Sequence, residues 1–159
     1  MPASDERTML NRFRWLLLTL VVVVAIAASC TSESTDYQYA LIQATCAPWD
    51  GPALQLTLAD EPLQCQRDVK GAYLMLGVWR GLPIHAGQTV KFSPKENNGF
   101  GSVCKKAAEC QAAESGEITF DHYDEGKGAT GHYELHFRNG KTLTGHFDAK
   151  WCYVRMFCG

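Results

Sequence analysis

An apolar segment near the N-terminus indicates the compartment in which the rest of the chain folds. Arg12 and Arg14 precede an unbroken apolar run from Trp15 to Ala28, and Ser29 and Cys30 follow it. A basic start, an apolar centre and small residues after it are the parts of a secretory signal. The run is shorter than the roughly 20 apolar residues that a membrane span needs. We therefore expect the chain to be exported, with the remaining residues folding independently of this segment.

The end of the apolar segment, Ala27-Ala28-Ser29-Cys30, resembles the lipobox of bacterial lipoproteins. The resemblance implies a signal peptide over residues 1–29 and a lipid, such as palmitate, on Cys30. It also implies a membrane anchor, with the protein facing the periplasm or the cell surface. The polar residues after Cys30 predict a flexible tether over residues 30–37. The alternatives are an ordinary secretory cleavage after Ala27 and an uncleaved N-terminal anchor.

The cysteine count agrees with export. The chain has seven cysteines, and without Cys30 an even number remains for three disulfides. These are Cys46, Cys65, Cys104, Cys110, Cys152 and Cys158. Disulfides persist in oxidising compartments, which an exported chain enters. No C-x-x-C motif occurs, which argues against a structural zinc knuckle or a thioredoxin-type redox site.

The spacing of the cysteines restricts their pairing. Cys104 and Cys110 bracket a short polar stretch and are predicted to close a local loop. Cys152 and Cys158 have the same spacing, but the residues between them are strand-like, and six extended residues span about 20 Å. That distance is too long for a disulfide. We therefore expect these two cysteines to bond to Cys46 and Cys65, in either of the two pairings.

Length and charge limit the classes of function. Residues 38–159 suffice for a single domain with a real core. The formal charge is −2, and because the first 14 residues hold three arginines against Asp5 and Glu6, the remainder carries about −3. No basic stripe occurs, so nucleic-acid binding is not expected.

The pattern of apolar residues predicts an all-β domain. Leu54, Leu56 and Leu58 alternate with polar residues, as in a half-buried strand. Residues 72–80 are apolar on both faces and predict a central strand, with Gly77 as a β-bulge. Residues 94–116 contain several glycines and read as an irregular loop. We predict a small antiparallel β-sandwich or flattened barrel of roughly six to eight strands, stapled by disulfides.

Residues 131–151 predict a β-hairpin with a defined register. Tyr133, Leu135 and Phe137 share one face of the first arm, and Leu143 and Phe147 belong to the matching face of the second. A two-residue Asn-Gly turn would place these two sets on opposite faces of the hairpin. A three-residue loop over residues 138–140 pairs Leu135 with Leu143 and places Gly140 in the left-handed conformation. We therefore predict the three-residue loop.

This register gathers polar side chains on the outer face. His132 falls opposite His146, about 5 Å apart at Cβ, with Glu134 and Asp148 nearby. Asp121 and Tyr123 are predicted to join this face if the preceding strand pairs there. Imidazoles beside carboxylates suit zinc or copper, so these four hairpin residues are the candidate metal ligands. The competing interpretation, a solvated β-sheet face without metal or any other cofactor, is favoured by the ordinary composition of such faces.

Other motifs give little support to catalysis. The sequence has no Gly-x-Ser-x-Gly nucleophile elbow. No cysteine is left as a nucleophile if Cys30 is lipidated, so we expect no enzyme activity. Trp49, Trp79, Trp151 and Tyr73 are expected to pack in the core. The alternative for Trp49, which lies in the turn Pro48-Trp49-Asp50-Gly51-Pro52, is an exposed contact residue.

Two further stretches, residues 46–54 and the closing G-x-Y-x-L-x-F…G-x-F-x-A-x-W-C pattern, are similar to uncharacterised exported bacterial lipoproteins. This resemblance implies a β-sandwich-like domain and assigns no activity. The leading hypothesis is a non-catalytic module of the cell envelope that binds an envelope protein or glycan. The alternatives are a zinc- or copper-binding lipoprotein and an inhibitor of a foreign enzyme such as lysozyme, acting through a loop over residues 95–110.

Overall fold

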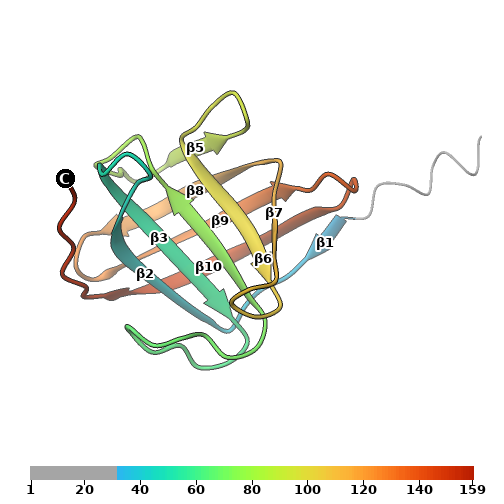
Figure 1. The fold of residues 1–159 in the computed structure, drawn as a ribbon, viewed down its shortest axis with the longest axis horizontal. Helices are drawn as coiled ribbons and strands as arrows, with labels where there is room; N and C mark the ends of the chain where they lie inside the picture. The colour runs from blue at the N-terminus through green and yellow to red at the C-terminus, as the bar shows by residue number, and fades with distance from the viewer. Residues whose placement is uncertain (1–31) are drawn as a thin grey trace, which may run out of the picture. The chain divides into compact units, whose positions relative to one another are not determined.

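The computed structural model describes residues 32–159, so the predicted signal peptide 1–29 and the lipid site Cys30 lie outside the described residues. Residues 32–159 form an all-β domain, which confirms the predicted fold class (Figure 1). No helix in this part of the chain is long and apolar enough to span a membrane. Its strands are β1 (Ser32–Ser34), β2 (Tyr39–Cys46), β3 (Pro52–Ala59), β4 (Tyr73–Val78), β5 (Gln88–Phe92), β6 (Gly99–Cys104), β7 (Cys110–Ala112), β8 (Ser115–Asp124), β9 (Gly128–His136) and β10 (Thr142–Cys152).

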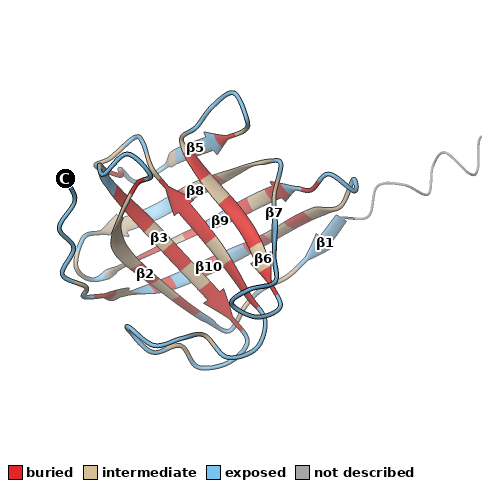
Figure 2. Ribbon diagram, viewed as in Figure 1, coloured by how far each residue is buried: buried red, intermediate tan, exposed pale blue. Residues whose placement is uncertain are grey.

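The strands form one continuous sheet in the order β5-β8-β9-β10-β2-β3-β4-β6-β7. Neighbours are antiparallel except for β10 with β2, and β1 also pairs with β10 in parallel. The sheet folds over, so that β2, β3, β4 and β6 cross in front of β8, β9 and β10 (Figure 1). Apolar residues of both layers form one core cluster, and the buried positions alternate along the strands (Figure 2).

The buried strands follow the predicted alternation. Leu54, Leu56 and Leu58 of β3 are all buried in the core. Strand β4 lies between β3 and β6, as expected for a central strand. The bulge predicted at Gly77 is wrong, because the β4–β6 ladder runs through Gly77 without a register shift. A Cβ at Gly77 would overlap the ring of Phe100 on β6, so this glycine makes room for an aromatic side chain instead.

The loop predicted over residues 94–116 is also wrong, since this stretch contains β6, β7 and the first residues of β8. Its glycines permit close packing instead of turns. A Cβ at Gly101 would lie 2.6 Å from a Leu135 methyl group and 3.2 Å from the Phe92 ring. Because glycine carries no side chain, the segment lacks the alternating pattern by which a strand is recognised.

The β9–β10 hairpin has the predicted register. Leu135 pairs with Leu143, and His132 pairs with His146. The loop has three residues: the Phe137 amide donates to the Lys141 carbonyl at 2.9 Å, and Gly140 adopts a φ of 80°. The coincidence of the two apolar sets on one face therefore decided the loop length correctly.

One residue of β8 changes the predicted composition of the outer face. The β8–β9 register shifts between Phe120 and His122, which leaves Asp121 as an extra residue. This bulge reverses the alternation, so Tyr123 turns inward and packs its ring against Phe120 and Trp151. Asp121 stays on the outer face as expected, whereas the outward placement of Tyr123 is wrong.

All three predicted disulfides form. Cys104 bonds to Cys110, and the open choice for the other four resolves to Cys46–Cys158 and Cys65–Cys152. The hairpin between β6 and β7 is thus closed at its base by the local disulfide. Three disulfides indicate an extracytoplasmic domain.

The segment predicted as a flexible tether is attached to the domain from Ser32 onwards. β1 runs parallel to the start of β10, with Ser32 opposite Thr142. The Thr35 amide donates to the Thr144 carbonyl at 2.9 Å, and the Tyr133 hydroxyl donates to the Thr35 carbonyl at 2.8 Å. The polar composition suggested a free segment, but Gly145 leaves space for the backbone of Thr35 beside it.

We expect Tyr133→Phe to weaken this attachment and to change the response to alkali. Burial, and to a lesser degree Tyr37 and Asp36, raise the pKa of the Tyr133 hydroxyl above its usual range. The folded state therefore holds this proton more tightly than the unfolded state, whose tyrosine pKa is about 10. The resulting stability is present below about pH 10 and is lost as the pH rises further.

The test of this expectation is urea unfolding at neutral and alkaline pH. The variant loses one hydrogen bond, about 1 kcal/mol at neutral pH, and its stability falls less steeply above about pH 10. A residual slope is expected from Tyr37, whose pKa is also raised by burial and by Asp60 and Glu33. An identical alkaline slope in both proteins would contradict the assignment to Tyr133.

Candidate functional site

The predicted histidine pair exists on the outer face of β9 and β10. His132 and His146 are direct cross-strand partners, both exposed, with ring centroids 6.1 Å apart. They border an open depression of about 280 Å³, which Glu117 and Glu134 also line. The position predicted from the hairpin register is thus confirmed.

The carboxylates, however, do not converge on this pair. His132 lies 3.6 Å from Asp121, and His146 lies 3.5 Å from Asp36. Glu134 instead contacts His136 at 3.1 Å. Asp148 lies opposite Thr130, two cross-strand pairs beyond the histidine pair. Within residues 32–159, no three histidine, cysteine or acidic side chains gather closely enough to hold a metal ion.

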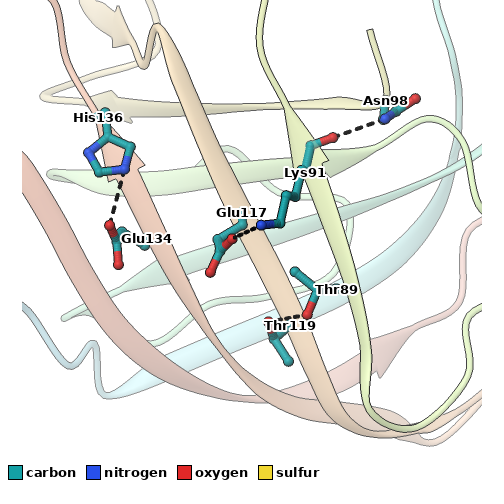
Figure 3. Close-up of polar contacts among 7 residues, drawn as sticks. All are labelled: Thr89, Lys91, Asn98, Glu117, Thr119, Glu134 and His136. Carbon is teal, nitrogen blue, oxygen red and sulfur yellow. Dashed lines mark hydrogen bonds and ion pairs between the residues drawn. The ribbon is translucent and has the colours of Figure 1, made fainter. Parts of the chain in front are cut away.

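The part of this outer face over β5, β8 and β9 carries polar side chains, among them His136 beside Glu134 (Figure 3). Lys91 on β5 pairs with Glu117 on β8 at 3.2 Å, and the hydroxyls of Thr89 and Thr119 are 2.8 Å apart. These groups are well exposed to water, where single ion pairs contribute little to stability. This part of the outer face is therefore exposed to solvent.

A second group of side chains forms a row of aromatic rings on the opposite layer, which we call the aromatic row: Trp49, Trp79 and Phe100. The Trp49 and Trp79 centroids are 6.1 Å apart and edge-to-face, and Trp79 lies 5.2 Å from Phe100. Trp79 directly follows β4, and Phe100 lies on β6 over Gly77. Three segments distant in sequence thus supply one continuous aromatic surface.

The turn that carries Trp49 is tightly constrained. The Ala47 amide donates to the Gly51 carbonyl at 2.8 Å, and the Asp50 amide donates to the Ala47 carbonyl at 2.9 Å. Asp50 adopts a φ of 61°, a conformation that asparagine and aspartate tolerate better than most residues. A Cβ at Gly51 would lie 2.9 Å from the Trp49 indole nitrogen. The turn therefore holds Trp49 in place while leaving 43% of this residue exposed.

A cation completes this surface. The Arg80 guanidinium lies 4.8 Å from the centre of the Trp49 ring, within the range of a cation–π interaction. Among residues 32–159, Arg80 forms no ion pair with a carboxylate. Its charge therefore remains available to a ligand that approaches the aromatic row.

Sequence reasoning identified this surface only in part. Core packing, the leading expectation for Trp49, is wrong, because 43% of this residue is exposed, which agrees with the alternative of a contact residue. Tyr73 and Trp151 pack in or against apolar clusters as predicted, but Trp79 belongs to the outer aromatic row instead of the core. Phe100 fell within the predicted loop, so nothing in the sequence placed it beside Trp79.

The segment predicted to act as an inhibitory loop, residues 95–110, is not a protruding loop. Strand β6 occupies its centre and lies between β4 and β7 in the sheet. Only the short turns on either side of this strand remain exposed loops.

Comparisons with protein-family models, curated proteins and solved structures find no match to this chain.

Proposed function

We propose that this chain is an exported lipoprotein, anchored through Cys30, whose β domain is a non-catalytic binding module of the cell envelope. The observation that supports this proposal is the aromatic row, in which Trp49 is exposed and Trp79 and Phe100 are half-buried, with Arg80 beside Trp49. Tryptophan and arginine dominate the energetics of binding surfaces, because they bury a large area and still offer polar contacts.

The rigidity of the surface favours binding. The turn around Trp49 starts at Cys46, which is bonded to Cys158, so a disulfide holds its base. Side chains that are already ordered lose less conformational entropy when a partner covers them. A fixed, half-exposed tryptophan is therefore a better contact residue than one on a flexible loop.

The position of the surface favours access from outside the membrane. Ser32, two residues after Cys30, lies beside Thr142 at one end of β10. At the other end, Cys152 pairs with Gln43, and the chain continues through Cys46 to the Trp49 turn. Ten residue steps along a strand span about 33 Å. A lipid on Cys30 would therefore leave the aromatic row at the far end of β10 from the anchor.

The proposal predicts that Trp49→Ala weakens binding to envelope material. The full-length protein, reconstituted in lipid nanodiscs, is mixed with solubilised envelope from the cells that produce it, and bound material is quantified. We expect at least a tenfold loss of affinity, the effect of removing a hot-spot side chain worth more than about 1.4 kcal/mol. Tyr39→Ala is the matched control, because Tyr39 is exposed to a similar extent on β2 and lies outside the aromatic row.

Two results would contradict the proposal. Equal binding by the Trp49→Ala variant and the unchanged protein would remove the aromatic row as the contact surface. An intact mass without lipid on Cys30, measured on protein purified from a bacterial membrane, would remove the anchor.

A further inference from the structure

The residues after β10 form a short loop that is covalently held at both ends. Cys152 is bonded to Cys65, and Cys158 is bonded to Cys46. We call the intervening residues, Tyr153–Phe157, the stapled loop. In Figure 1 it runs at the side of the domain where β2 and β3 are connected.

This loop exposes an unusual amount of apolar surface. Phe157 is 92% exposed and Tyr153 is 74% exposed, and Met156 is also exposed. These are three of the five large hydrophobic residues exposed in residues 32–159. A fourth is Trp49, whose turn begins directly after Cys46, the bonding partner of Cys158. Grouped exposed apolar residues mark interaction sites, whereas isolated ones are common on any surface.

Polar contacts hold the first residue of the loop and leave the last ones free. The Gln66 side-chain amide donates to the Tyr153 carbonyl at 3.2 Å. The Tyr153 hydroxyl donates to the Gly126 carbonyl at 2.7 Å. Tyr153 therefore fixes the start of the loop to the domain, whereas the Phe157 side chain is exposed to solvent.

We propose that the stapled loop inserts Phe157 into an apolar pocket of a protein partner whose rim carries carboxylates. This inference rests on the proposed function and names its partner class. A single protruding ring on a braced loop suits a concave protein pocket, and the disulfides reduce the entropy cost of insertion. Arg155, exposed in the same loop, forms no ion pair within the described residues and supplies the charge that acidic rim groups would meet.

Position argues against the bilayer as the occupant. The predicted lipid site Cys30 is two residues before β1, and β1 pairs with the start of β10, whereas the loop leaves β10 at Cys152. A separate acidic protein is therefore the occupant that the loop fits best.

The inference is tested by photo-crosslinking in the full-length anchored protein. Phe157 is replaced by p-benzoylphenylalanine in the cells that produce the chain, and irradiation is followed by separation of the adducts. We expect one discrete protein adduct, reduced at least fivefold when Arg155→Glu is added and reduced by high salt. The same probe at Arg138, an exposed position in the β9–β10 turn, is the control and should give no such adduct.

Each other outcome would overturn the inference. These outcomes are the absence of an adduct, an adduct with a second copy of the chain, an adduct with phospholipid, or an adduct that Arg155→Glu does not change. The Trp49→Ala binding result separates the two proposals. If Trp49→Ala still weakens envelope binding while Phe157 gives no protein adduct, the binding function stands and only the role of the stapled loop fails.

Discussion

Replacing Cys46 and Cys158 together by serine is expected to lower the free energy of unfolding by about 3–4 kcal/mol. The Cys65–Cys152 disulfide stays closed in this variant, so the lost link closes a loop made of residues 46–65 and 152–158 of the unfolded chain. The entropy of closing a loop grows with its length, and about 25 residues give an effect in the middle of the usual range. Urea unfolding followed by tryptophan fluorescence, in wild type and double variant, measures the difference.

The local disulfide provides the matched control. Cys104 and Cys110 are only 6 residues apart, and the same reasoning predicts a loss of about 2 kcal/mol when both become serine. Equal losses in the two double variants would show that chain entropy does not explain the stabilisation. The variant without Cys46–Cys158 should also free the end of the stapled loop. Increased proteolysis between residues 152 and 159 would show this release.

Phe120→Ala is expected to cost about 3–5 kcal/mol, the range for deleting a large aromatic side chain from a packed core. Phe120 on β8 is fully buried, and its ring contacts Tyr123 and Phe147 edge-to-face at 6.1 and 5.8 Å. The substitution leaves a cavity where β8, β9 and β10 meet, and neighbouring backbone cannot easily close it. Thermal and urea unfolding both measure the loss.

Phe157→Ala is the control for this second prediction. The same chemical change at a residue that is 92% exposed removes almost no buried area, so unfolding should shift by less than about 0.5 kcal/mol. A large loss at Phe157 would mean that its ring packs on the domain in solution, and it would also count against the proposed insertion into a partner. A small loss at Phe120 would contradict its central place in the core.

Where the sequence carried an alternating pattern, the structure followed it. The leucines of β3 and the two apolar sets of the β9–β10 hairpin could be placed correctly because burial of one face dictates register. Where glycines occupy strand positions, the sequence lacks the alternation of apolar and polar residues. Gly99 and Gly101 of β6 therefore read as loop residues, although their missing side chains are what lets this strand pack against Gly77, Leu135 and Phe92.

The candidate sites show the same division. The cross-strand histidine pair followed from local register alone. The separation of its carboxylates depended on the extra residue Asp121 and on Asp36, which arrives through the pairing of β1 with β10. The aromatic row joins residues from three separate segments, and no local pattern predicts that Trp49, Trp79 and Phe100 meet.

The sequence alone determined the all-β class, the number of disulfides and the local hairpin, because these depend on composition, cysteine count and the two-residue period of a strand. The tertiary structure decided which distant cysteines bond, and it brought the stapled loop next to the Trp49 turn through Cys46–Cys158. It also placed Ser32–Ser34 in a strand, where the sequence had predicted a flexible tether. The reason is physical: long-range pairing is selected by the shared burial of the whole core, and no short stretch of residues contains that information.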